Sequence, residues 1–204
     1  MNVGTLYIIA APSGGGKSSL VSALIKILPR LKVSVSHTTR PMRPGEQNGV
    51  QYHFVEQAIF DALLRENTFL EHAQVFDHCY GTSRDWVLEQ LQKGLDVILE
   101  IDWQGARQVR HLLPQSVGIF ILPPSRTQLG ERLHARAQDP DNVIARRMHG
   151  AITELKHYDE FDYLVLNDDF DTALADLQSI IRCRQLRTSV QIVKLKDLLA
   201  SLLV

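Results

Sequence analysis

A strand, a tight turn and a helix are encoded together near the start of the chain, where the apolar run 6–10 leads into Ala11-Pro12-Ser13-Gly14-Gly15-Gly16-Lys17-Ser18. Small residues let successive backbone N–H groups turn inward around an anion, while the lysine supplies a cation and the serine a hydroxyl for Mg²⁺. A helix beginning at Lys17 adds the partial positive charge of its N-terminus, which favours a phosphate. The pattern therefore predicts a strand–loop–helix unit that binds nucleotide phosphates. The usual motif begins with glycine, so Ala11 must lie where a Cβ is tolerated.

Apolar runs and amphipathic segments alternate along much of the chain. Helical spacing of apolar residues marks 17–28 and 170–187, whereas near-continuous apolar runs are typical of strands covered on both faces by helices. The predicted strands are 4–10, 32–36, 95–101, 117–122 and 163–166. This alternation predicts an α/β fold in which a P-loop NTPase-type parallel sheet is flanked by helices.

The composition suits one compact domain of 204 residues and argues against several functional classes. Lys+Arg 22 against Asp+Glu 23 gives a net charge of −1, so no overall field draws the protein to nucleic acid or to a membrane. No segment approaches the roughly 20 apolar residues that span a bilayer, and the N-terminal apolar run lacks the basic leader of a signal peptide. Cys79 and Cys183 lie far apart in sequence, which fits a reducing compartment and predicts a cytoplasmic location.

Two segments interrupt the alternation of strands and helices. Residues 36–82 are rich in aromatic residues and are predicted to form short strands. Residues 125–157 are polar and rich in arginine, and they are predicted to be helical, with little apolar periodicity to hold them on the core. We interpret both segments as insertions that fold over the core.

Arg40 and Arg43 lie three residues apart on a segment that neighbouring prolines keep out of a helix. Their guanidinium groups can converge on one anion, and the hydroxyl groups of Ser36, Tyr52 and Tyr80 would complete a second phosphate site. Two phosphate sites imply two substrates. The alternative is that the two arginines only form surface salt bridges.

Several further segments are together far more specific than the phosphate loop. They are Ser34-Val35-Ser36-His37-Thr38-Thr39-Arg40, Glu71, Tyr80-Gly81-Thr82-Ser83, Glu100-Ile101-Asp102-Trp103-Gln104-Gly105 and Asn167-Asp168-Asp169. In these segments the chain resembles the guanylate kinase family, and the match runs from about Gly4 to Arg182. The resemblance implies an enzyme that transfers a phosphoryl group from ATP to GMP, and also to dGMP, with Mg²⁺. Such an activity is essential for recycling GMP and supplying guanine nucleotides.

The resemblance also implies a division of the chain into parts. A guanylate kinase-like domain would cover 4–182, and a helical tail would follow at 183–204. Within the domain, the core would comprise 4–35, 83–123 and 158–182, with a GMP-binding insertion at 36–82, called the flap below, and a mobile lid at 124–157.

Roles for individual residues follow from matching positions in the family. The ATP phosphates would contact the loop 11–18, and Asn167 would also bind ATP. Lys17 and the lid arginines would stabilise the transferring phosphoryl group, and Ser18 and Asp102 would hold Mg²⁺. The catalytic residues would be Lys17, Arg132, Arg136 and Arg147; the GMP phosphate would bind Ser36, Arg40, Arg43, Tyr52 and Tyr80; and Glu71, Thr82 and Asp102 would bind the base.

The chemistry of guanine supports this choice of base-binding residues. Guanine presents adjacent N1–H and N2–H₂ donors, which one carboxylate such as Glu71 can accept together, while its O6 and N7 acceptors call for a donor such as Thr82. A buried carboxylate facing adenine would lose these donors, so we expect discrimination against AMP of ~10³-fold or more. Taken alone, Glu71 could equally be a solvated strand residue.

Other residues keep more than one interpretation. Asp102 follows an apolar strand, where it could approach Mg²⁺, contact guanine or cap the next helix. Asn167 and Asp168 could approach the adenine of ATP or act as caps. The apolar stripe from Val190 to Val204 could pack on the protein's own core or form a homo-oligomer contact.

Two other functions compete with the transfer of phosphate to GMP. A related kinase could use the same architecture on a phosphorylated sugar, although a sugar has no base edge for Glu71 and Thr82 to contact. A non-catalytic interaction module could keep the fold without the chemistry. The presence of Lys17, Arg40 and Arg43 argues against such a module.

Overall fold

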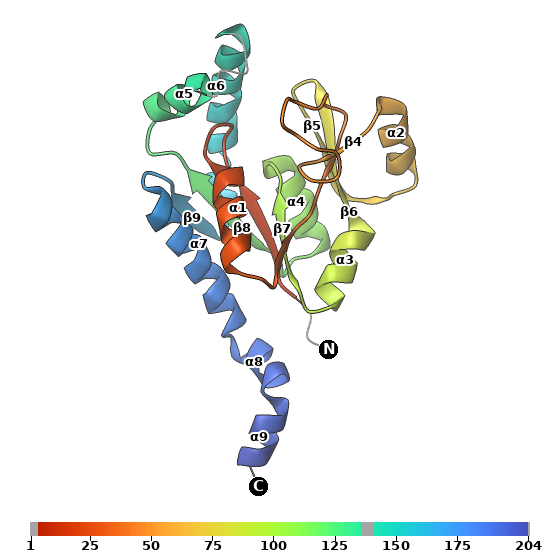
Figure 1. Cartoon of the computed structure of the whole chain (residues 1–204), viewed down its shortest axis with the longest axis vertical. Helices are drawn as coiled ribbons and strands as arrows, with labels where there is room; N and C mark the ends of the chain where they lie inside the picture. The colour runs from red at the N-terminus through yellow and green to blue at the C-terminus, as the bar shows by residue number, and fades with distance from the viewer. Residues whose placement is uncertain (1–3, 136–140, 204) are drawn as a thin grey trace.

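A five-stranded parallel sheet forms the centre of the protein (Figure 1). The computed structural model describes residues 4–135 and 141–203. The strand order is β2-β7-β1-β8-β9, and every neighbouring pair is parallel, which confirms the predicted α/β class and P-loop NTPase-type sheet. The strands are β1 Leu6–Ala10, β2 Leu31–Val33, β7 Asp96–Glu100, β8 Val117–Leu122 and β9 Tyr163–Leu166.

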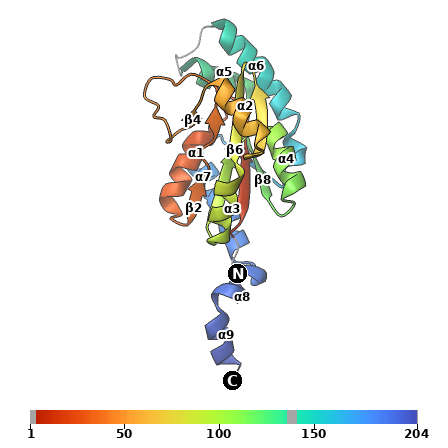
Figure 2. The same cartoon turned by 90° about the vertical axis from the view of Figure 1, so that its right-hand side faces the viewer.

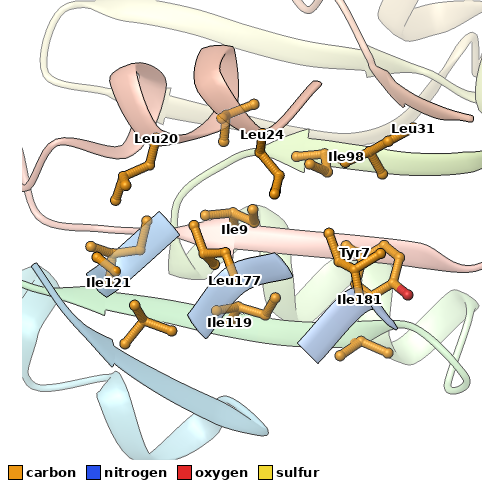
Figure 3. Close-up of a cluster of buried hydrophobic side chains, with 14 residues drawn as sticks. Tyr7, Ile9, Leu20, Leu24, Leu31, Ile98, Ile119, Ile121, Leu177 and Ile181 are labelled. Atoms are coloured by element: carbon orange, nitrogen blue, oxygen red, sulfur yellow. The ribbon is translucent and has the colours of Figure 1, made fainter. Parts of the chain in front are cut away.

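Helices cover one face of this sheet through a continuous apolar cluster. Tyr7 and Ile9 of β1 point to this face, where α1 (Lys17–Ile27) and α7 (Phe170–Gln185) pack (Figure 3). Leu20 and Leu24 of α1 are fully buried there, as the helical spacing predicts. This packing fixes the N-terminus of α1 directly behind the phosphate loop.

The opposite face receives the alternate side chains of the same strand. Leu6 and Ile8 join a second cluster with residues of α3 (Arg84–Gln92) and α4 (Trp103–Leu112). Because side chains alternate along a strand, a strand covered on both faces needs apolar residues at every position, and all five residues of β1 are buried.

The flap forms a separate four-stranded sheet in the order β4-β3-β6-β5. It also contains a helix, α2 (Gln57–Arg65), where only short strands were predicted. The apolar residues at 59, 60, 63 and 64 have helical spacing, and Phe60 is the residue of α2 that reaches the core. The strands are β3 His37–Thr38, β4 His53–Phe54, β5 Phe69–Val75 and β6 His78–Ser83.

The lid contains two helices, α5 (Arg126–Ala135) and α6 (Asp141–Leu155), followed by a short 3₁₀ turn at Tyr158–Glu160. The prediction of helices is confirmed. The expectation that little would hold the lid on the core is wrong, because Leu129 and Leu133 are each 1% exposed. Both lie against the phosphate loop, where a Cβ on Gly14 would meet their side chains at 3.1 Å.

The tail leads away from the body of the protein (Figure 1, Figure 2). It contains two seven-residue helices, α8 (Thr188–Lys194) and α9 (Lys196–Leu202). Leu198 is 51% exposed and Leu202 is 70% exposed, so the interpretation that the whole stripe packs on the protein's own core is wrong. None of the helices in the described part of the chain has both the length and the apolar character needed to cross a membrane.

Candidate functional site

The phosphate loop lies at the carboxyl edge of the sheet, between β1 and α1 (Figure 1). Gly14 and Gly16 have φ angles of 89° and 91°, which side chains rarely allow. A Cβ at Gly15 would lie 2.9 Å from the carbonyl oxygen of Pro12. The loop therefore needs its three glycines for conformation and for space. Ala11 packs beside the buried core, so its Cβ is tolerated.

Asn167 supports this loop from the end of β9. Its Nδ2 donates a 2.8 Å hydrogen bond to the carbonyl oxygen of Gly15, and the residue is 5% exposed. The carbonyl oxygen of Asn167 in turn accepts a 3.0 Å bond from Arg132 Nη2. Asn167 thus joins the loop to the lid, and its predicted contact with ATP stays a prediction. Asp169, close behind, caps α7 by accepting from Thr172 N.

A carboxylate lies beside the first turn of α1, and it is a residue that the sequence analysis did not assign. Ser18 Oγ donates a 2.7 Å bond to Glu100 Oε2. Glu100 ends β7 and pairs with Ile9, directly before the loop. Glu100 lies within the predicted strand 95–101, whereas Asp102 follows that strand. Asp102 itself caps α4 by accepting a 3.0 Å hydrogen bond from Gly105 N, as one of its interpretations predicts. Its predicted role in binding Mg²⁺ stays a prediction.

The second lid helix contacts the loop through Ser13. Arg147 donates to Ser13 Oγ from Nε at 3.0 Å and from Nη2 at 2.7 Å. Glu154, two turns further along α6, accepts a 3.0 Å bond from Ser13 N. Burial raises the pKa of Glu154 to about 7, although Lys17 nearby lowers it. No pattern in the sequence indicated Glu154, because its partner lies far away along the chain.

One lid arginine carries a buried donor that lacks a partner within residues 4–135 and 141–203. Arg132 Nη1 is buried and makes no hydrogen bond to any of the described residues. A buried guanidinium donor beside a phosphate loop fits an anionic ligand, since buried polar groups are normally satisfied. Arg136, also predicted to contact phosphate, lies outside the described residues.

A second cationic group lies in the flap and is centred on Arg40. Arg40 Nη2 lies 2.7 Å and 3.0 Å from the two carboxylate oxygens of Glu46, and Arg43 N donates to Glu46 at 2.7 Å. The Arg40 guanidinium also lies 5.4 Å from the ring centroid of Tyr52, which meets Tyr80 edge-on at 5.8 Å. Since the Arg40 side chain is 10% exposed, a loose surface ion pair does not describe it. Glu46 was not assigned from sequence, although it lies only three residues after Arg43.

The carboxylate of Glu71 is buried where β5 of the flap meets α4. The residue is 3% exposed, which rules out the solvated alternative. Thr82 Oγ1 donates a 2.5 Å bond to Glu71 Oε1, and Ser36 Oγ lies 3.5 Å from the same hydroxyl group. A Cβ on Gly105 would overlap Glu71 Oε2, so glycine leaves room for the carboxylate. Burial raises the pKa of Glu71 to about 7.

The phosphate loop and the buried carboxylate of Glu71 lie close enough to influence each other electrostatically. Lys17 lowers the pKa of both Glu71 and Glu154, and Asp102 raises both. On the flap, burial raises the pKa of Tyr52 to about 12, with Tyr80 and Glu100 adding to the shift. A cation, a glycine loop and a buried carboxylate therefore occupy one region at the carboxyl edge of the sheet.

A glycine loop that precedes a lysine, a helical lid whose arginines contact that loop, and a buried carboxylate within electrostatic reach of the lysine define a P-loop nucleotide kinase. A family model described as "Guanylate kinase" matches residues 3–184. The chain belongs to the guanylate kinase family, and it is therefore a nucleoside monophosphate kinase of the transferase class, with ATP as phosphoryl donor and GMP as acceptor.

Individual relatives agree with the family assignment. The chain is 56% identical to a guanylate kinase of Aliivibrio fischeri over 205 residues, which cover 100% of this chain and 99% of that protein. It is 55% identical to a guanylate kinase of Legionella pneumophila over 202 residues, covering 99% and 97%. The crystal structure of guanylate kinase from Anaplasma phagocytophilum superposes with a TM-score of 0.76 at 32% identity, covering 92% of this chain and 89% of that one.

Proposed function

We propose that the protein transfers the γ-phosphoryl group of ATP to GMP and to dGMP with Mg²⁺, giving ADP and the corresponding diphosphate, and so recycles GMP into the guanine nucleotide supply. The observation that carries this proposal is the buried carboxylate of Glu71, held by Thr82 within electrostatic reach of Lys17. A buried carboxylate suits a base with two adjacent donors, which guanine has and adenine lacks.

On the acceptor side, the GMP phosphate binds the cationic group of the flap. Arg40 offers a planar guanidinium fork, and its present partner Glu46 holds that fork in place. The base contacts Glu71, Thr82 and Asp102. The proposed phosphate ligands are Ser36, Arg40, Arg43, Tyr52 and Tyr80.

On the donor side, the ATP phosphates bind the loop 11–18, with Asn167 beside it. A phosphate oxygen of GMP attacks the γ-phosphorus in line, and ADP leaves, so the protein has little covalent work to do. Lys17, Arg132, Arg136 and Arg147 neutralise charge on the transferring oxygens. The buried Nη1 of Arg132, which has no hydrogen-bond partner in the described part of the chain, supports this role for the lid.

The residues beside Ser18 fit Mg²⁺, which prefers oxygen ligands. Ser18 is in contact with Glu100, and Asp102 lies two residues further on. These three side chains would hold the ion directly or through its waters. When bound, Mg²⁺ neutralises charge on the donor phosphates.

The parts of the chain receive roles accordingly. The core at 4–35, 83–123 and 158–182 carries ATP, the flap at 36–82 binds GMP, and the lid at 124–157 closes over both. Closure excludes water and brings the arginines to the phosphates. The two free cysteines, Cys79 and Cys183, support a reducing cytoplasmic location.

The test is a coupled assay of ADP release with GMP, dGMP, AMP, UMP and a sugar phosphate as acceptors. We expect turnover with GMP and dGMP and at least ~10³-fold less with AMP. Preference for the sugar phosphate would instead assign a sugar kinase. Lack of ADP release with every acceptor, from protein that binds GMP, would indicate a non-catalytic module.

We also propose that the tail joins copies of this chain into a homo-oligomer. Helices of seven residues are marginal on their own, and α9 exposes Leu198 and Leu202. A hollow of about 640 Å³ along α7, lined in part by Cys183 and Leu186, offers a surface for a partner's tail. Sedimentation should give a mass above 23.1 kDa that Leu198→Asp reduces to the monomer. A wild-type monomer would contradict the proposal.

A further inference from the structure

The tip of the flap touches the lid. Phe76 and Asp77 form the turn between β5 and β6, and Arg146 lies on α6 of the lid. Arg146 Nη1 and Nη2 donate to the two carboxylate oxygens of Asp77 at 2.8 Å and 3.0 Å. The two segments are far apart in sequence, so this ion pair joins the two insertions directly. Both segments lie at the end of the molecule away from the tail (Figure 2).

The same contact has an apolar part. The Arg146 guanidinium lies 5.2 Å from the centroid of the Phe76 ring. Phe76 has a φ angle of 54°, an uncommon conformation for a bulky residue. Its ring reaches Gly150, where a Cβ would lie 3.2 Å from Phe76 Cζ. A glycine inside a helix is unfavourable, so its position opposite this ring indicates that close approach is what the site needs.

Each side of this contact is connected to a different substrate site. β5 carries Glu71, and its pairing with β6 continues as far as Val75 and His78, directly beside the turn. On the lid, Arg146 is adjacent to Arg147, which contacts Ser13 of the phosphate loop. A shift of the flap that follows GMP binding would therefore be transmitted through a paired hairpin to a helix that contacts the ATP loop.

We propose that Phe76, Asp77, Arg146 and Gly150 are positioning residues that latch the flap to the lid, so that GMP and ATP increase each other's affinity. This inference rests on the proposed function, in which the flap binds GMP and the lid closes on ATP. Coupling between two ligands is reciprocal, so the latch must strengthen both affinities by the same factor. The latch contributes nothing when only the flap or only the lid has closed.

The latch is expected to be modest and sensitive to salt. The side chains of Arg146 and Asp77 are 56% and 68% exposed, so added salt screens their attraction. Hydrogen-bonding geometry and the ring contact add to the ion pair. The coupling between GMP and ATP should therefore weaken as ionic strength rises.

The experiment measures the dissociation constant of GMP by calorimetry, with and without a saturating non-hydrolysable ATP analogue and Mg²⁺. Asp77→Asn should reduce the coupling factor about threefold, and Arg146→Gln about fivefold, because the second change also removes the contact with the ring. The affinity for GMP alone should stay unchanged. Asp77→Arg combined with Arg146→Asp should recover part of the coupling. The matched control is Glu89→Gln, which breaks an equally exposed ion pair on α3.

Gly150→Ala provides an independent test. Alanine favours the helix, so the lid should become more resistant to thermal unfolding, while the coupling falls because the new Cβ meets Phe76. In a Phe76→Ala background, Gly150→Ala should leave the coupling unchanged. Unaltered coupling in Asp77→Asn and Gly150→Ala, from enzyme that still phosphorylates GMP, would overturn the latch. Failure of the wild type to phosphorylate GMP would overturn the proposed function instead.

Discussion

The two phosphate sites proposed for this protein are built by different means. At the donor site, the backbone would do most of the binding, and glycines such as Gly14 and Gly16 allow it conformations that other residues rarely adopt. At the acceptor site, side chains do the work, and Arg40 and Glu71 are held by partners from elsewhere in the flap. The donor site should therefore tolerate few changes of any kind, whereas the acceptor site should respond to the chemistry of each side chain.

The largest effect is expected at the donor site. Lys17→Ala removes the cation proposed to contact the phosphates during the transfer, so turnover should fall about 10³-fold. The circular dichroism spectrum and melting temperature should change little, because Lys17 is partly exposed at the start of α1. Lys26→Ala, on the exposed side of the same helix, is the control. Near-normal turnover in Lys17→Ala would exclude this lysine from the reaction.

On the acceptor side, Glu71→Gln should lower kcat/KM for GMP about 10²-fold and leave the KM for ATP unchanged. The amide keeps the shape of the side chain, but it presents only one acceptor oxygen to the two donors of guanine. The ratio of GMP to AMP activity should fall as well. Glu66→Gln, an exposed change on the same flap, should leave both values intact. A parallel loss for both substrates would mean that Glu71 supports the fold and does not contact the base.

Arg40→Ala should weaken GMP binding about 30-fold while ATP binding changes little. The reason is the loss of a guanidinium fork, together with the unpaired charge that remains on Glu46. Arg40→Lys keeps the charge and loses the fork, so it should recover only a small part of the affinity. Calorimetry with each nucleotide separates the two sites. Equal losses for both nucleotides would place Arg40 outside the acceptor site.

The same contrast explains which features could be predicted from the sequence. The phosphate loop and the strand before it depend on neighbouring residues, so local patterns were sufficient for 11–18 and for the core strands. The contact of Glu154 with Ser13 joins residues 141 positions apart, and no local pattern encodes it. On α5, the buried residues that anchor the lid are Leu129 and Leu133, and two apolar residues on a polar helix give no clear periodicity.

Elsewhere, the prediction of site residues was limited because residues close together in sequence could not be told apart. Glu100 and Asp102 both lie near the end of the same apolar strand, and sequence alone cannot say which one lies beside Ser18. Only the register of β7 against β1, which pairs Glu100 with Ile9, decides the matter. In the flap, the aromatic content favoured strands, although the apolar spacing near Phe60 was that of a helix. The assignments of individual residues to GMP, ATP and Mg²⁺ stay predictions for the experiments above.

The smallest expected effect is the dependence on pH. It distinguishes the contribution of Glu71 to stability from its contribution to GMP binding. Burial raises the pKa of Glu71 to about 7, so the folded protein holds a proton that the unfolded chain would lose near pH 4.5. The stability that this proton provides is full below pH 4.5 and declines as the pH rises through 7. The protein without nucleotide should therefore melt at a higher temperature at pH 6 than at pH 8.

Binding of GMP should change in the opposite direction, because the two donors of guanine need the ionised carboxylate. From pH 6 to pH 8, kcat/KM for GMP should rise about tenfold as Glu71 loses its proton. Glu71→Gln should remove that rise, apart from the part that comes from the phosphate group of GMP itself, which also titrates near pH 6. The same variant should keep part of the pH-dependent melting, because burial also raises the pKa of Glu154 to about 7. A pH profile for GMP that is identical in the wild type and Glu71→Gln would show that this carboxylate does not bind the base.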